Sequence, residues 1–163
     1  MFDEYFKFAF VRNPWNRMVS IYKYFEYDKI SSFKSFLTGE FRNNLFKNKH
    51  WFVGPQSDYV YSEDGELLVD YVGRFEDLQN DFNHICKQIG LPPTKLPHVN
   101  ASKNKRSILS KNPKSMLRNI LYTLKIKKPP YYKNYRKYYD KESIDLVAEF
   151  YQKDIELFGY DFE

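Results

Sequence analysis

The strongest constraint on the fold is a strand-like segment that runs directly into a helical pattern. Residues 5–11 are rich in aromatic and β-favouring side chains, and this run stops abruptly at Asn13 and Pro14. Asparagine is a good helix cap and proline suits the first helical position, and apolar side chains then recur at helical spacing as far as Phe25. The sequence therefore predicts a buried strand, a turn that carries Arg12, and an amphipathic helix.

The same order recurs in the middle of the chain. Residues 71–75 predict a second buried strand, and Asp77 is expected to cap a helix that Gly90 stops. Buried strands alternating with helices are typical of an α/β fold with a parallel sheet, in which ligands bind at the carboxyl ends of the strands. Arg12 lies at such an end.

Three further segments complete the expected elements. Residues 32–46 predict one or two short helices that are broken near Gly39. Turn-forming residues inside 59–69 indicate a small hairpin. Asp140 is expected to cap one final amphipathic helix that ends at Gly159.

The composition indicates a folded protein without a membrane span. Aromatic residues make up 20% of the 163 residues, too many for a disordered chain, and we expect one domain over 1–163. The longest apolar runs fall far below the roughly 18 residues of a membrane helix, and no signal peptide opens the chain. The single cysteine, Cys86, and widely spaced histidines predict no structural metal and a reducing compartment, which favours the cytoplasm.

The charges are unevenly distributed along the chain. Between Phe82 and Tyr139 every charged side chain is Lys or Arg, whereas residues 140–163 are predominantly acidic. Such a basic block attracts a polyanion, a nucleotide or a membrane surface, and its alternative role is that of a solvated linker. Within it, residues 116–124 show a weak helical pattern.

Two arginines and a serine follow the first predicted strand, at Arg12, Arg17 and Ser20. A guanidinium offers a planar fork of donors to two phosphate oxygens, a hydroxyl donates one more hydrogen bond, and a helix N-terminus adds positive potential. These groups predict an anion site for a phosphate. The alternative is structural: Arg17 pairs with a surface carboxylate, and Ser20 caps its own turn.

Residues 8–22 as a whole resemble the 3′-phosphate-binding motif of the sulfotransferases, in particular their carbohydrate sulfotransferase-like branch. The resemblance implies a P-loop-NTPase-like parallel sheet flanked by helices. It also implies the donor 3′-phosphoadenosine 5′-phosphosulfate, a carbohydrate or polysaccharide acceptor, and contacts from Arg12 and Ser20 to the donor's 3′-phosphate. Further segments similar to that family follow in the same order, at 50–59, 69–78 and 138–160.

The sequence departs from the family pattern at one point. The family has a glycine-containing loop that holds the 5′-phosphosulfate upstream of the arginine motif, but no glycine here precedes a Lys-Ser or Lys-Thr pair. We therefore expect an N-terminally incomplete fold and severely reduced turnover, because positioned cations and amides supply most of the stabilisation in such transfers. A missing N-terminal segment would also be the place of any membrane anchor.

Other residues are candidates for separate roles. His50, in a segment similar to the family, is the candidate general base, with an acceptor-contacting or structural role as its alternative. Glu76 is expected to anchor a loop by accepting backbone hydrogen bonds rather than to act in catalysis. Lys103 and Arg106 lie in a segment that resembles the family's donor-covering segment. A basic insertion at about 104–134 is interpreted either as a polysaccharide-binding segment or as a surface loop.

Two other functions compete with the transferase. A non-enzymatic nucleic-acid-binding module would use the basic block and the tyrosines of residues 131–139 for stacking, whereas the transferase interpretation expects no specific nucleic acid. A P-loop kinase lacks its Walker lysine here. The acceptor sugar and the oligomeric state leave no signal in the sequence.

Overall fold

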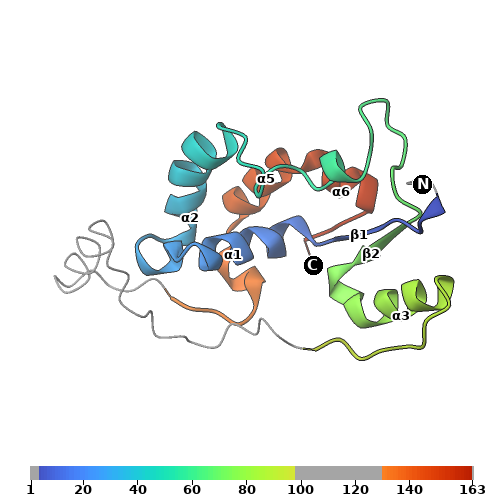
Figure 1. Cartoon of the computed structure of the whole chain (residues 1–163). Helices are drawn as coiled ribbons and strands as arrows, with labels where there is room; N and C mark the ends of the chain where they lie inside the picture. The colour runs from blue at the N-terminus through green and yellow to red at the C-terminus, as the bar shows by residue number, and fades with distance from the viewer. Residues whose placement is uncertain (1–3, 98–129, 163) are drawn as a thin grey trace, which may run out of the picture.

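The computed structural model describes residues 4–97 and 130–162. Among these residues, the sheet has two parallel strands, β1 (Phe8–Val11) and β2 (Tyr71–Arg74) (Figure 1). The two strands pair along their whole length, from Phe8 with Tyr71 to Val11 with Arg74. Both strands occur where the sequence predicts them, and their parallel pairing confirms the α/β class. The larger P-loop-like sheet stays a prediction.

The strands are less buried than the sequence predicts. Phe8 on β1 is 44% exposed, and on β2 only Gly73 is buried. Gly73 is required by a close approach, since a Cβ atom there would lie 2.5 Å from Cε1 of Phe10. The prediction was therefore right in the type of element and wrong in the degree of burial. Parallel strands are fully buried when helices cover both faces of a wide sheet, and the described sheet has only two strands.

Helix α1 (Pro14–Tyr24) follows β1 as predicted and lies at the centre of the molecule (Figure 1). The side chain of Asn13 caps it by accepting from the amides of Trp15 and Asn16. On one side α1 contacts α5 (Lys141–Phe150), and it also contacts the short 3₁₀ helix η6 (Tyr135–Tyr138). Its apolar face is fully used, with Trp15, Met18, Val19, Ile21 and Tyr22 buried.

The region after α1 contains the 3₁₀ helix η2 (Tyr27–Lys29), helix α2 (Phe33–Phe36) and the π-helix η3 (Leu37–Phe46). The predicted break near Gly39 was wrong, because α2 continues directly into η3 through helical backbone at Phe36. The buried side chains Leu37, Phe41 and Leu45 follow one another at four-residue steps, so packing against the core holds this segment helical through the glycine.

The predicted hairpin is present in reduced form. After the 3₁₀ helix η4 (Ser57–Tyr59), a single antiparallel bridge joins Tyr61 to Leu67. Gly65 lies in the turn with a φ of 84°, a left-handed conformation that favours glycine. Polar and exposed side chains fill this turn, which explains why the strands do not extend further.

Helix α3 (Leu78–Gln88) follows β2 after the 3₁₀ turn η5 (Phe75–Asp77). Asp77 stands at the predicted cap position, but its carboxylate forms no cap and accepts from the side chain of Asn80 instead. The cap prediction was therefore wrong, since the preceding 3₁₀ turn leads the chain into α3. Gly90, with a φ of 74°, follows the end of the helix as expected.

The expected final helix is divided into α5 and α6 (Gln152–Phe158) at Tyr151, whose φ is −124°. Asp140 forms the predicted cap and shares a capping box with Ser143. Gly159 ends α6 with a φ of 61°. The prediction of one continuous helix was wrong. After the break at Tyr151, the buried carboxylate of Asp154 in α6 accepts hydrogen bonds from the amides of Gln56 and Ser57.

The main hydrophobic core lies among α1, α2, η3, α5 and α6. Ile85 and Cys86 of α3 are buried outside this cluster. Within residues 4–97 and 130–162, no helix is long and apolar enough to cross a membrane. The weak helical pattern at 116–124 and most of the expected insertion at 104–134 lie outside the described residues.

Candidate functional site

The backbone of Arg12 is fixed at the carboxyl end of β1 by one side chain. The Arg12 amide donates to Oε1 of Gln56 at 2.9 Å, and Nε2 of Gln56 donates to the Arg12 carbonyl at 2.8 Å. The carboxylate of Asp154, fully buried in α6, accepts from the amides of Gln56 and Ser57 at 2.7 and 2.8 Å. These hydrogen bonds hold the Arg12 turn against the helical core.

The Arg12 guanidinium is oriented but not neutralised. It donates to Oδ1 of Asn16 at 2.9 Å, and its carbon lies 4.4 Å from the centre of the Phe75 ring. Its Nε is buried without a hydrogen-bond partner. Burial lowers the pKa of Arg12, and the negative charge of Glu76 only partly opposes this. A buried donor without an acceptor is costly, so this arrangement is suited to an anion.

The Arg12 guanidinium lies beside the helix face that carries Ser20. Arg12 precedes the cap Asn13 and stands outside α1, but it donates to Asn16. Asn16 and Ser20 are four residues apart in α1, so their side chains are neighbours on the helix. Ser20 is half-buried in the interior of a helix that continues to Tyr24, so it does not cap a turn. Among the described residues, its hydroxyl has no hydrogen-bond partner.

Arg17 has a structural role that differs from the predicted surface ion pair. Its guanidinium donates to the carbonyls of Gly54 at 2.9 Å and Phe52 at 3.1 Å. It also lies 5.5 Å from the centre of the Tyr151 ring. The ion-pair interpretation was wrong, because the loop at 52–54 passes over α1 and offers carbonyls in place of a carboxylate.

Glu76 acts as the predicted anchor. One carboxylate oxygen accepts from the Asn13 amide at 2.8 Å, and the other accepts from the Tyr160 hydroxyl at 3.2 Å. Burial is the main cause of the raised pKa of Tyr160. Glu76 therefore connects the end of β2 to the start of α1 and to the C-terminal segment.

His50 lies apart from the contacts of Arg12. It is exposed, with its ring 5.6 Å from that of Phe52. The adjacent Trp51 is 78% exposed, and its carbonyl accepts from the hydroxyl of Tyr59. A role for His50 as the base stays a prediction. Lys103 and Arg106 lie outside the described residues.

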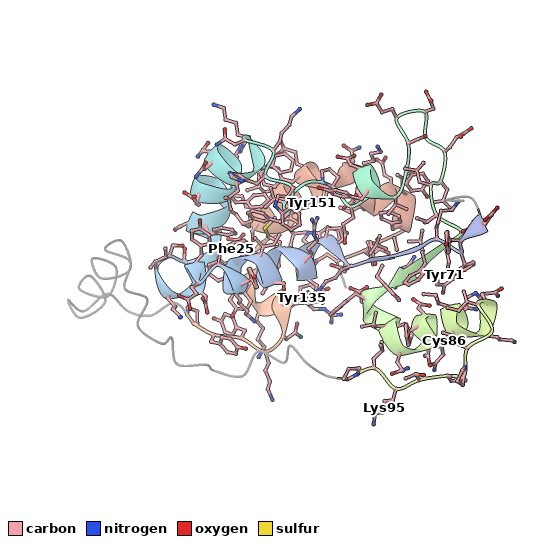
Figure 2. All side chains as sticks on the ribbon, in the orientation of Figure 1. Phe25, Tyr71, Cys86, Lys95, Tyr135 and Tyr151 are labelled. Carbon is pink, nitrogen blue, oxygen red and sulfur yellow. The ribbon has the colours of Figure 1, made fainter. Side chains whose placement is uncertain are left out.

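A cavity of about 290 Å³ opens beside the N-terminal end of α1. Asn16, which accepts from Arg12, is one of its lining residues, and Tyr135, Arg136 and Tyr160 are others. Figure 2 shows Tyr135 next to this part of α1. The guanidinium of Arg136 has no carboxylate in ion-pair contact within residues 4–97 and 130–162. The cavity is thus polar and adjoins the Arg12 site.

The tyrosines of residues 131–139 are not a free stacking surface. Tyr138 and Tyr139 pack against the core, and the Tyr139 hydroxyl donates to the Trp15 carbonyl at 2.8 Å. Burial raises the pKa of Tyr139 well above its ordinary value. The expectation that all of these tyrosines are available for stacking was wrong for Tyr138 and Tyr139, because these two rings stabilise the fold. Tyr131, by contrast, is 56% exposed.

Sequence reasoning missed Gln56 and Asp154, which position Arg12. Asp154 gives a usable signal, since it lies three residues after Tyr151 and four before Phe158 on the apolar face of its helix. A carboxylate on an apolar face indicates a buried, hydrogen-bonded role. Gln56 gives no such signal, because its two-way bond to Arg12 depends on the tertiary structure.

Within the described ranges, no cluster of His, Cys, Asp and Glu side chains could hold a metal ion. The model of the sulfotransferase family matches residues 1–161 of the chain. An uncharacterized protein of Archaeoglobus fulgidus is 33% identical over 114 residues, which cover 67% of this chain and 89% of that protein. No solved structure matches the chain.

Proposed function

Because this chain belongs to the sulfotransferase family and is therefore a transferase, we propose that the Arg12 site holds the donor of a sulfuryl transfer. The proposed donor is 3′-phosphoadenosine 5′-phosphosulfate, and its 3′-phosphate is the group bound by Arg12 and Ser20. The observation that carries the proposal is the Arg12 guanidinium, which has a buried Nε without a partner. The proposed acceptor is a carbohydrate hydroxyl.

The donor supplies the sulfuryl group, which leaves the 5′-phosphate oxygen and forms a bond to the acceptor oxygen as the acceptor hydroxyl loses its proton. Arg12 is suited to bind and orient a phosphate, because Phe75 covers one face of its guanidinium and Asn16 holds one of its nitrogens. Gln56 fixes the backbone of Arg12, so binding costs this residue little further conformational freedom. His50 is the base that we propose to test by substitution.

The first test is a calorimetric titration of adenosine 3′,5′-bisphosphate into the full chain at low salt. We expect Arg12→Ala to weaken binding by at least about tenfold, since hydrogen bonds to charged groups contribute roughly 1.5–3 kcal/mol. Arg42→Ala removes an exposed arginine of η3 and serves as the matched control, with no expected loss.

Two results would contradict the proposal. The first is a wild-type chain that is folded by circular dichroism but binds no bisphosphate. The second is equal affinity in the wild type and in Arg12→Ala. Salt-sensitive binding of single-stranded DNA that the bisphosphate does not displace would instead favour the nucleic-acid alternative.

A further inference from the structure

A second cation lies on the face of α1 that carries Ser20 and Asn16, the hydrogen-bond partner of Arg12. Lys23 follows Ser20 by three residues, so the two side chains are neighbours on the helix surface, about 4.5 Å apart along the axis. The Lys23 ammonium donates to the Tyr132 carbonyl at 3.1 Å. Lys23 thus follows Ser20 on this face, and the Arg12 guanidinium contacts Asn16, one turn before Ser20.

Neither of these cations has a counterion in contact. Among the ion pairs within residues 4–97 and 130–162, none involves Arg12 or Lys23. Burial lowers the pKa of Lys23, and the positive charge of Arg12 lowers it further, while the carboxylate of Asp28 opposes both. Two partly buried cations on one helix face repel each other, and an anion between them would relieve that repulsion.

The position of the ammonium is fixed by a separate segment of the chain. The rings of Tyr131 and Tyr138 have their centres 4.5 and 4.9 Å from Nζ of Lys23. The Tyr138 hydroxyl accepts from the Tyr132 amide at 2.9 Å, which ties the two parts of this segment together. A lysine held by two rings and a carbonyl is already ordered, so its use in binding loses little side-chain entropy.

We propose that Lys23 is a third contact of the phosphate bound by Arg12 and Ser20, and that Tyr131 and Tyr138 position it. This inference rests on the proposed function, since it requires a phosphate beside Ser20. The ligand chemistry is that of a phosphate dianion, which a nucleoside 3′-phosphate and free inorganic phosphate share. Two cations and a hydroxyl on one face match its charge and its acceptors.

The test compares three ligands on full-length variants by calorimetry: adenosine 3′,5′-bisphosphate, adenosine 5′-monophosphate and inorganic phosphate. We expect Lys23→Gln to weaken the affinity for the bisphosphate by about tenfold, which is the effect of one charge-assisted hydrogen bond. The affinity for the 5′-monophosphate should stay unchanged. Lys23→Arg should retain most of the affinity. Lys47→Gln, at an exposed position after η3, is the matched control and should behave as the wild type.

The outcomes separate this inference from the proposed function. Wild-type affinity in Lys23→Gln, together with lost binding in Arg12→Ala, overturns the role of Lys23 alone. Equal weakening of the bisphosphate and the 5′-monophosphate overturns the contact to the 3′-phosphate. If inorganic phosphate binds as tightly as the bisphosphate, the phosphate that this site recognises is not that of a nucleotide. If Lys23→Gln does not fold, Tyr131→Leu tests the same contact, with an expected weakening of about twofold to threefold.

Discussion

Two regions of the molecule differ in how they are held together. In the helical body, formed by α1, α2, η3, α5 and α6, aromatic side chains pack into one continuous core. In the strand region, formed by β1, β2 and α3, the residues Phe8, Ile89 and Leu91 stay exposed and only a few side chains are buried. Arg12 lies where the two regions meet. Its backbone is fixed through Gln56, and the ring of Phe75 from the strand region covers its guanidinium.

This difference shows how the site combines rigidity with access. The carboxylate of Asp154 belongs to the body and holds Gln56, so the backbone of Arg12 depends on the better-packed region. The guanidinium itself lies against Phe75 and beside Asn16, which lines the polar cavity. The two regions should therefore differ in their response to substitution, and a change in the body that releases Gln56 should affect stability and binding together.

The largest expected effect compares Leu37 and Ile85, two fully buried aliphatic residues, one in each region. We expect Leu37→Ala to lower the free energy of unfolding by about 4 kcal/mol and Ile85→Ala by about 2 kcal/mol, because the sparser surroundings of α3 can relax around the cavity. Urea unfolding of both variants measures this. Equal losses would show that the strand region is packed as tightly as the body.

A smaller effect is expected where the body positions the site. Asp154→Ala leaves the amides of Gln56 and Ser57 without acceptors, which should cost about 2–3 kcal/mol in the free energy of unfolding. It should also weaken bisphosphate binding, because Gln56 no longer fixes Arg12. Glu156→Ala removes an exposed carboxylate from the same helix and should change neither quantity. Unchanged binding in a folded Asp154→Ala protein would separate Asp154 from the site.

The smallest effect concerns the cap of α5, at the surface of the body. Hydrogen bonds from Ser143 are the main reason that the pKa of Asp140 lies well below its usual range, and Lys34 contributes to this lowering. A carboxyl whose pKa is lowered by folding stabilises the fold above its unfolded pKa of about 3.9, and this contribution is lost as the pH falls further. Asp140→Ala should cost about 1 kcal/mol at pH 7.

The measurement for this cap is thermal unfolding between pH 2 and pH 7. The difference between Asp140→Ala and the wild type should shrink as the pH falls below about 3.9, the unfolded pKa of an aspartate, towards the lowered pKa of Asp140. Asp145→Ala, an exposed position on the same helix, supplies the control and should show a much smaller difference at pH 7. A difference that is independent of pH would argue against the charged carboxylate as the cap.

Elements whose signals are local could be predicted from the sequence. The step from strand to helix at Asn13 and Pro14, and the cap at Asp140, depend on residues adjacent in the chain, and the structure confirms them. Such features are encoded locally because hydrogen bonds and dihedral preferences act over a few residues.

Features that depend on distant residues could not be predicted from local signals, because they arise from tertiary packing. The helix that continues through Gly39 and the break at Tyr151 follow from packing, which overrides local preference. The clamp of Gln56 on Arg12 and the rings around Lys23 join segments far apart in the chain. The spacing of residues along a sequence carries no information about which carbonyl, carboxylate or ring will lie beside a given cation, because burial and long-range contacts decide that only when the chain folds.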